Sequence, residues 1–180
     1  MTTTDLTCGT WFTLKNGSQV LVRMLREADA ESLADFFTKG LSPTSRDLFF
    51  AYGMDPLIVE WVREEPNSDR VFRLIALSGD TIVAYAYWRV QLTNPGLPLL
   101  SIAVADQYQG IGLGTLLMDL LIEEAKARKM KGIELHVFKH NARALGLYKK
   151  LGFQVVGQTY DGRQWIMEKR FAPIGRRRRS

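Results

Sequence analysis

The chain has 180 residues, 46% of them hydrophobic and 24% charged, which is the balance of a folded globular protein and excludes a disordered one. This length predicts one domain with its own core. The formal net charge is +5, but the terminal run Arg176 to Arg179 supplies four of the 24 basic residues. The rest of the chain is nearly neutral, which argues against a broad nucleic-acid-binding surface.

The ends of the chain predict the domain boundaries and the location. We expect an N-terminal segment at residues 1–18, a domain at 19–172, and a disordered basic tail at 173–180. A tail contact with nucleic acid or the ribosome is the less favoured alternative. One cysteine and two histidines exclude a disulfide framework and predict no metal site. No signal peptide or membrane span is predicted, so we expect a cytoplasmic protein. The oligomeric state stays open between monomer and homodimer.

The first third of the chain predicts a strand, a helix and an irregular segment. Alternating residues over Gln19 to Leu25, after the turn signal Asn16-Gly17, predict the strand. Apolar residues at helical spacing over Ala28 to Phe37 predict the helix, with Gly40 as its stop. Residues 41–66 are rich in aromatic residues and broken by proline and glycine. We expect them to be irregular, with aromatics that line a pocket or, the favoured interpretation, complete the core.

The middle of the chain predicts a hairpin, a buried strand and a long helix. Val71 to Leu77 and Thr81 to Val90 are β-branched and aromatic runs joined by a glycine turn, which predicts the hairpin. The near-continuous apolar run Leu97 to Ala105 predicts a central strand buried on both faces. The leucine face that begins at Leu113 predicts a helix that ends at Gly132.

The last part of the chain predicts four further elements. These are a strand over Ile133 to Phe138, a helix over Asn141 to Leu151 stopped at Gly152, and strands near Phe153 to Gly157 and Gln164 to Lys169.

The segment with the clearest chemistry is Gln109-Gly110-Ile111-Gly112-Leu113-Gly114, between the buried strand and the long helix. Three alternating glycines allow a tight turn and a close approach of a ligand to the backbone. Free amides at the start of a helix favour an anion, so a phosphate group is the expected ligand. A plain turn between strand and helix is the alternative.

Two common phosphate loops fit this segment poorly. A Walker loop requires a lysine after its last glycine, but Thr115 follows Gly114. A dinucleotide fingerprint requires the third glycine one residue later; Glu134, twenty residues after Gly114, keeps this a weak alternative. The predicted hairpin argues against it, because a doubly wound sheet alternates strand and helix from its start.

A third pattern fits better. Gln109, Gly112 and Gly114 resemble the Gln/Arg-x-x-Gly-x-Gly/Ala loop of the GCN5-related N-acetyltransferases (GNAT). The segment from Asn141 through Tyr148 to Phe153 resembles the second motif of this family at the family's spacing. The resemblance implies an α+β fold: a mostly antiparallel central sheet of about seven strands with helices on both faces. It also implies a splay between the fourth and fifth strands, here Leu97 to Ala105 and Ile133 to Phe138.

The resemblance implies acetyl-CoA as co-substrate and assigns residues to it. Backbone groups of Ile102, Ala103 and Val104 would bind the pantetheine arm, and Asn141 would contact it, although an ordinary helix N-cap is the alternative for Asn141. The pyrophosphate would lie on the loop residues Gln109, Gly110, Ile111, Gly112, Leu113, Gly114 and Thr115.

The resemblance also implies the groups that move protons. Tyr148 matches the tyrosine that faces the thioester sulfur and protonates the leaving thiolate; a core tyrosine is the alternative. Leu135-His136-Val137 resembles the Leu-Glu-Val run of the acetyltransferases that modify ribosomal-protein N-termini, whose glutamate is the base. A histidine accepts a proton near neutral pH, so His136 is the candidate base; a histidine with a structural role alone on the strand is the alternative. Glu134, expected on the same strand face, is the reserve candidate, and His140 is expected to be a loop residue.

The expected function is transfer of an acetyl group from acetyl-CoA to a primary amine by direct attack. The acceptor stays open between a protein N-terminus, a lysine and a small amine. We expect its pocket to be walled by residues 41–66 and by Tyr160-Asp161-Gly162. The alternative function is a non-catalytic module that binds or senses acyl-CoA.

Overall fold

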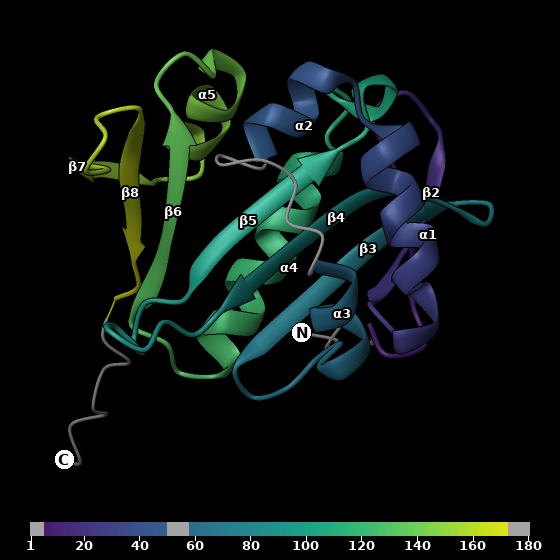
Figure 1. Ribbon diagram of the computed structural model, residues 1–180, viewed down its shortest axis with the longest axis horizontal. Helices are drawn as coiled ribbons and strands as arrows, with labels where there is room; N and C mark the ends of the chain where they lie inside the picture. The colour runs from purple at the N-terminus through teal and green to yellow at the C-terminus, as the bar shows by residue number, and fades with distance from the viewer. Residues whose placement is uncertain (1–5, 50–57, 173–180) are drawn as a thin grey trace, which may run out of the picture. The chain divides into compact units, whose positions relative to one another are not determined.

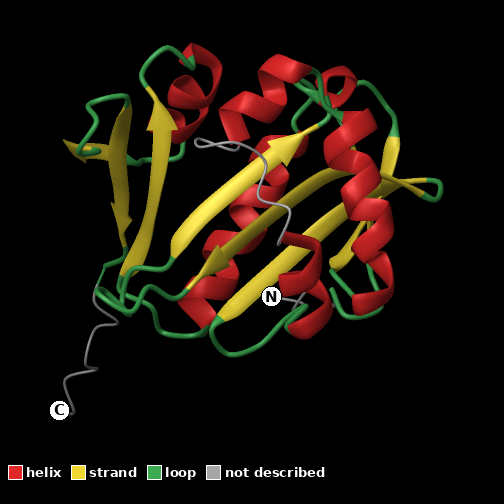
Figure 2. Ribbon diagram, in the orientation of Figure 1, coloured by secondary structure: helices red, strands yellow, loops and turns green. Residues whose placement is uncertain are grey.

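Figure 1 shows the computed structural model, which describes residues 6–49 and 58–172. Within these residues the chain forms eight strands and five α-helices, and the strand pairs are mostly antiparallel (Figure 2). The predicted mixed fold class is confirmed. The described residues form two compact units, one of the residues up to Arg89 together with Leu100–Leu121, and another of Val90–Leu99 together with the residues from Ile122 onward.

The first unit contains five strands in sequential order. They are β1 (Thr10–Thr13), β2 (Gln19–Met24), β3 (Val71–Ser78), β4 (Thr81–Arg89) and β5 (Leu99–Val104). The predicted hairpin is confirmed, because β3 and β4 pair antiparallel around a turn in which Gly79 has φ +57°. The sequence did not predict β1, whose four residues are too few for a visible alternation and whose Trp11 is exposed. β1 is the strand beyond the seven expected.

The predicted first helix is confirmed in position. It begins with a 3₁₀ turn (Glu27–Asp29), continues as α1 (Ala30–Asp35) and ends in a π-helical turn, η2 (Phe36–Gly40). Its buried side chains pack in one core cluster with side chains of β3 and β4; members from these elements are Ala30, Leu33, Phe36, Phe37, Ile75, Leu77, Ile82 and Tyr85. In this unit α1 and α3 lie on one face of the strands and the start of α4 on the other (Figure 1).

The prediction that residues 41–66 are irregular is wrong, because α2 (Pro43–Phe49) and α3 (Ile58–Glu64) lie within them. Proline is compatible with the first position of a helix, where its missing N–H leaves no bond unmade. The Ser42 Oγ accepts a hydrogen bond from the Ser45 N–H at 3.2 Å, as an N-cap does. Phe49 packs against Phe37 at 5.2 Å between ring centroids, which supports the core interpretation for this aromatic. Phe50 and Tyr52, and the side chain of Trp61, lie outside what the structure describes.

The expected burial of β5 on both faces is wrong. Leu100 and Ala103 are buried, whereas Ser101, Ile102 and Val104 are only partly so. A run of apolar residues therefore overstated the burial of this strand, since apolar side chains also occur on partly exposed faces.

The long helix, α4 (Leu113–Ala127), ends earlier than predicted. The chain reverses at Lys129, a non-glycine residue with φ +59°. Gly132 is not a helix stop but the first residue of β6 (Gly132–Phe138). It is glycine for a different reason: a Cβ there would lie 2.5 Å from the Lys169 carbonyl oxygen.

The second unit contains three strands and the predicted helix. Its strands follow the order β6, β8 (Gln164–Arg170) and β7 (Gln154–Gln158), with antiparallel pairing throughout. The helix is α5 (Ala142–Lys150), followed by Gly152 at φ +86°. All four elements predicted for this part of the chain are confirmed. The predicted splay, the single domain and its boundaries stay predictions.

Candidate active site

The glycine loop adopts the backbone that its sequence predicts. Gly110 has φ +79° and Gly112 has φ +98°, values that side-chain-bearing residues rarely adopt. α4 starts directly afterwards, and the Leu116 N–H donates to the Gly112 carbonyl oxygen at 3.0 Å. Because the first N–H groups of a helix have no acceptor within it, the start of α4 presents amides that suit an anion.

Gln109 holds this loop against the end of β5. Its side-chain amide donates to the Val104 carbonyl oxygen at 2.9 Å, and its backbone N–H donates to the Asp106 carbonyl oxygen at 3.2 Å. Val104 is one of the β5 residues expected to bind a pantetheine arm. Its carbonyl oxygen already accepts this hydrogen bond from Gln109. Ile102 and Ala103 precede it on the same strand.

Two serines at the start of α2 surround the carboxylate of Asp106, in the turn between β5 and the loop. The carboxylate accepts hydrogen bonds from the Ser42 N–H at 3.0 Å, the Ser42 hydroxyl at 3.0 Å and the Ser45 hydroxyl at 2.8 Å. The Ser42 backbone N–H, followed by the two hydroxyls, holds the pKa of the Asp106 carboxyl below its ordinary value. These bonds fix the start of α2 to the segment that leads into the glycine loop.

The turn between β1 and β2 also contacts the loop, which the sequence analysis missed. The Lys15 N–H donates to the Ile111 carbonyl oxygen at 3.1 Å. The methylene stem of Lys15 crosses Gly112, with Cγ at 3.4 Å and Cε at 3.5 Å from the position of a Cβ on that glycine. No local pattern joins Lys15 to a loop almost a hundred residues later, so only the folded structure reveals this contact.

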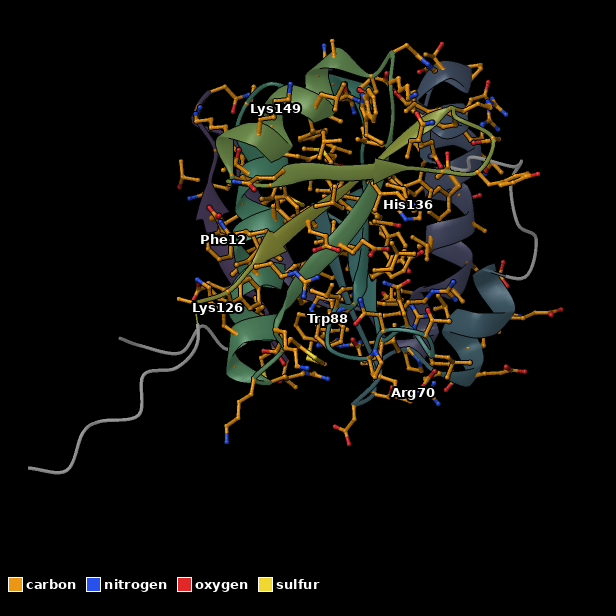
Figure 3. All side chains as sticks on the ribbon, turned by 90° about the vertical axis from the view of Figure 1, so that its left-hand side faces the viewer. Phe12, Arg70, Trp88, Lys126, His136 and Lys149 are labelled. Carbon is orange, nitrogen blue, oxygen red and sulfur yellow. The ribbon has the colours of Figure 1, made fainter. Side chains whose placement is uncertain are left out.

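In the second unit, the structure brings together the two candidate bases on β6. The His136 Nε2 lies 3.2 Å from the Glu134 Oε1, and the side chains are 33% and 15% exposed. Figure 3 labels His136 among the side chains. The Gln91 side-chain amide donates to the same Glu134 oxygen at 3.3 Å and to the Leu97 carbonyl oxygen at 2.8 Å. Glu134 is thereby held in place, and it can orient the imidazole beside it.

Tyr148 is in α5 and only 7% exposed. Its ring packs 5.9 Å from that of Phe153, so the core interpretation is correct for its position. Burial raises the pKa of the Tyr148 phenol well above its ordinary value. The side chain therefore keeps its proton at any physiological pH, as a proton donor must.

Asn141 and His140 lie between β6 and α5. Asn141 is the N-cap of α5, and its Oδ1 accepts from the Ala144 N–H at 3.1 Å. His140 follows β6 in a turn, with its ring 5.3 Å from that of Phe138, so its prediction as a loop residue is confirmed. Within the described residues, no group of three or more His, Cys, Asp or Glu side chains could hold a metal ion. No helix there has the length and apolar character to cross a membrane.

Residues 30–153 match the acetyltransferase (GNAT) family. The chain belongs to this family. The match covers α1, the whole glycine loop, His136 and Tyr148.

Individual relatives of the GNAT family are similar over shorter stretches. The [ribosomal protein bS18]-alanine N-acetyltransferase of Escherichia coli strain K12 is 44% identical over 89 residues, which are 46% of this chain and 59% of the relative. The L-methionine sulfoximine/L-methionine sulfone acetyltransferase of Pseudomonas paraeruginosa is 35% identical over 75 residues, 42% of this chain and 44% of the relative. The chain thus spans about half the length of these relatives.

Solved GNAT structures share the fold. The GNAT domain of S. lividans PAT superposes with a TM-score of 0.80 at 18% identity, covering 91% of this chain and 97% of that one. The PaiA N-acetyltransferase of Thermoplasma acidophilum, solved in complex with coenzyme A, gives a TM-score of 0.63 at 19% identity over 84% and 99% of the two chains.

Proposed function

We propose that this protein transfers an acetyl group from acetyl-CoA to a primary amine. The observation that carries the proposal is the glycine loop: Gly110 and Gly112 adopt left-handed backbone directly before the start of α4, in a chain of the GNAT family. The relatives named above are acetyltransferases, and one fold neighbour was solved with coenzyme A, which supports the choice of co-substrate. The cytoplasmic location predicted from the sequence stays part of this proposal.

The cofactor would be held mainly by backbone. The amides from Gly110 to Thr115 would bind the pyrophosphate, and backbone groups of Ile102 and Ala103 would bind the pantetheine arm. Gln109 is bonded to Val104 and so acts on the cofactor through the position of the loop. Asn141, which caps α5, would contact the arm while keeping that role.

The chemistry requires two proton movements. The neutral amine attacks the thioester carbonyl carbon and forms a tetrahedral oxyanion; the carbon–sulfur bond then breaks and an amide remains. The nitrogen loses one proton to a base, and the departing thiolate gains one from an acid, so the products are the amide and the coenzyme A thiol. Tyr148, buried and protonated, is the proposed acid.

His136 is the proposed base, with Glu134 as its partner. The contact of 3.2 Å between the two side chains lets the carboxylate stabilise the imidazolium that forms when the amine proton is taken. At 33% exposure, the imidazole can release that proton to water. Glu134 is the positioning residue in this arrangement rather than a competing base.

The proposed acceptor is a primary amine. It stays open whether this amine belongs to a protein N-terminus, a lysine or a small molecule. The relatives above act, by their names, on a ribosomal-protein alanine and on L-methionine sulfoximine or sulfone, which share an α-amino group but differ in side chain. The walls of the acceptor pocket, expected at residues 41–66 and Tyr160-Asp161-Gly162, stay a prediction from the sequence. The basic tail lies outside the described residues.

The test is acetyl-CoA-dependent release of free thiol by the purified full chain. The acceptors are a panel of amino acids, polyamines, amino sugars and ribosomal-protein N-terminal peptides, with mass spectrometry of each product. We expect thiol release that depends on one class of amine and yields a stoichiometric acetylated product. Binding of acetyl-CoA without transfer to any amine would instead identify a non-catalytic module.

A further inference from the structure

We propose that Lys15 supplies the positive side chain of the cofactor site and pairs with the pyrophosphate of acyl-CoA. The inference rests on the proposed function, because it assigns a residue to the ligand of the same loop. Lys15 stands in the turn between β1 and β2, outside the segment that matches the GNAT family.

The turn that carries Lys15 is well defined. The preceding residue, Leu14, is buried, and its N–H donates to the Ser18 carbonyl oxygen at 2.8 Å. Gly17 has φ +85°, and its N–H donates to the Leu14 carbonyl oxygen at 2.9 Å. The Asn16 Oδ1 accepts from the Ser18 hydroxyl at 2.7 Å. The backbone of Lys15 is therefore fixed on both sides.

The same turn is bonded to the glycine loop. The bond from the Lys15 N–H to the Ile111 carbonyl oxygen, at 3.1 Å, lies between the two left-handed glycines. The stem of Lys15 then runs across Gly112, with Cγ, Cδ and Cε at 3.4, 3.7 and 3.5 Å from a Cβ placed on that glycine. The ammonium group is one bond beyond Cε, so the charge lies beside Gly112.

The charge of Lys15 has no partner within the described residues. No carboxylate there lies within ion-pair distance of it, whereas Lys39 pairs with Asp35 at 2.7 Å and Lys126 with Glu123 at 2.8 Å. The acidic group nearest the loop in sequence, Asp106, is occupied by the two serines of α2. An ammonium beside free amides and without a carboxylate favours an anionic ligand.

The loop itself lacks any basic residue. From Asp106 to Met118 the sequence contains no lysine, arginine or histidine. A Walker loop carries its lysine within its own sequence and directs it at the phosphates. Here the backbone amides come from the loop, and we infer that the β1–β2 turn provides the cation that the loop lacks.

The experiment compares Lys15→Met with the wild-type chain. Methionine keeps an unbranched stem over Gly112 and removes the charge, and Lys15→Arg restores the charge. Lys39→Met is the matched control, because Lys39 is an exposed lysine in the same unit as Lys15. Each variant is titrated calorimetrically with acetyl-CoA, with acetyl-dephospho-CoA and with acetyl-pantetheine, at low and high salt, after circular dichroism has verified an unchanged fold.

We expect Lys15→Met to weaken acetyl-CoA about tenfold, the size of one phosphate contact, and to reduce the dependence of affinity on salt. Lys15→Met should lose the same factor of affinity for acetyl-dephospho-CoA, which keeps the pyrophosphate. It should lose no affinity for acetyl-pantetheine, which lacks the pyrophosphate. Lys15→Arg should recover most of the affinity, and Lys39→Met should bind as the wild type does.

Two results would overturn the inference while leaving the proposed function intact. One is unchanged acetyl-CoA affinity in Lys15→Met. The other is a loss that disappears with acetyl-dephospho-CoA, which would assign Lys15 to the 3′-phosphate instead. A wild-type chain that binds none of the three ligands would remove the proposed function itself.

Discussion

The glycine loop of the first unit offers a ligand backbone N–H groups, whereas β6 and α5 of the second unit offer side chains. The loop's geometry follows from residue types: Gly110 and Gly112 adopt left-handed backbone because they have no Cβ. On β6 and α5, the properties of His136 and Tyr148 follow from their surroundings. One is beside a carboxylate and partly exposed, and the other is buried against Phe153.

Substitutions in the glycine loop should therefore affect binding, and substitutions on β6 and α5 should affect turnover. Changes to the loop alter the backbone that meets the cofactor, so they should change its affinity. Changes to His136 or Tyr148 leave that backbone untouched and remove a proton acceptor or donor, so they should change the rate.

The largest effect is expected for Tyr148→Phe. This change removes only the hydroxyl and should lower turnover about 10²-fold or more, with little change in acetyl-CoA affinity. Steady-state thiol release and calorimetry measure the two quantities. Tyr85→Phe is the matched control, because Tyr85 is also a buried tyrosine but belongs to the core cluster of the first unit. Equal turnover in Tyr148→Phe and wild type would leave Tyr148 with its core role alone.

The next effect is expected for Gly112→Val. A β-branched residue at φ +98° is strained, and its side chain would meet the stem of Lys15. Acetyl-CoA affinity should fall by at least about tenfold, as judged by calorimetry. Gly79→Val imposes similar strain in the β3–β4 turn, where a Cβ has open space, and should leave affinity unchanged. Gly114 was expected to act as Gly112 does, but it is within α4 and has no positive φ. Gly114→Val should therefore have the smaller effect.

A moderate effect is expected for the β6 pair. His136→Ala should lower turnover at least about tenfold and remove the rise of rate with pH that a histidine base produces. Glu134→Gln keeps the shape of the partner but not its charge, so it should reduce the rate less than His136→Ala does. pH–rate profiles measure both, with His140→Ala as the control. A profile common to His136→Ala and wild type would reject the assignment.

The smallest effect concerns stability in alkali. Burial raises the pKa values of Tyr148 and Tyr85, so the folded chain holds protons that the unfolded chain releases above about pH 10. Their contribution to the free energy of unfolding is full below that pH and is lost as pH rises beyond it. Urea unfolding between about pH 8 and pH 11 should show the fall, with a shallower slope in Tyr148→Phe. An equal slope in the variant would contradict the burial of a protonated phenol.

Most of the fold could be predicted because local patterns specify it. The β3–β4 hairpin followed from two β-branched runs around a glycine turn, and α5 followed from Asn141 at its start and Gly152 after its end. Two wrong predictions share a cause, because proline or glycine was interpreted as a break in secondary structure. Residues 41–66 contain prolines and glycine but also form two short helices. Gly132 was taken for a helix stop, although its neighbours in space, Lys169 and Leu97, require a glycine there.

The candidate site divides in the same way. The loop could be recognised because glycines at fixed spacing have few other uses. Glu134 and His136 were correctly predicted to share a strand face, but the sequence could not say that Gln91 holds the glutamate. Lys15 could not be predicted as a site residue, because its contact with Gly112 exists only in the folded chain.

The most direct test of the account is a calorimetric titration of acetyl-CoA into the wild-type chain and into Gly112→Val. The account predicts saturable binding of one acetyl-CoA per chain in the wild type, competed by coenzyme A, and weaker binding in the variant. Absence of binding to the wild type, or equal affinity in the two proteins, would contradict the assignment of Gln109 to Thr115 to the pyrophosphate.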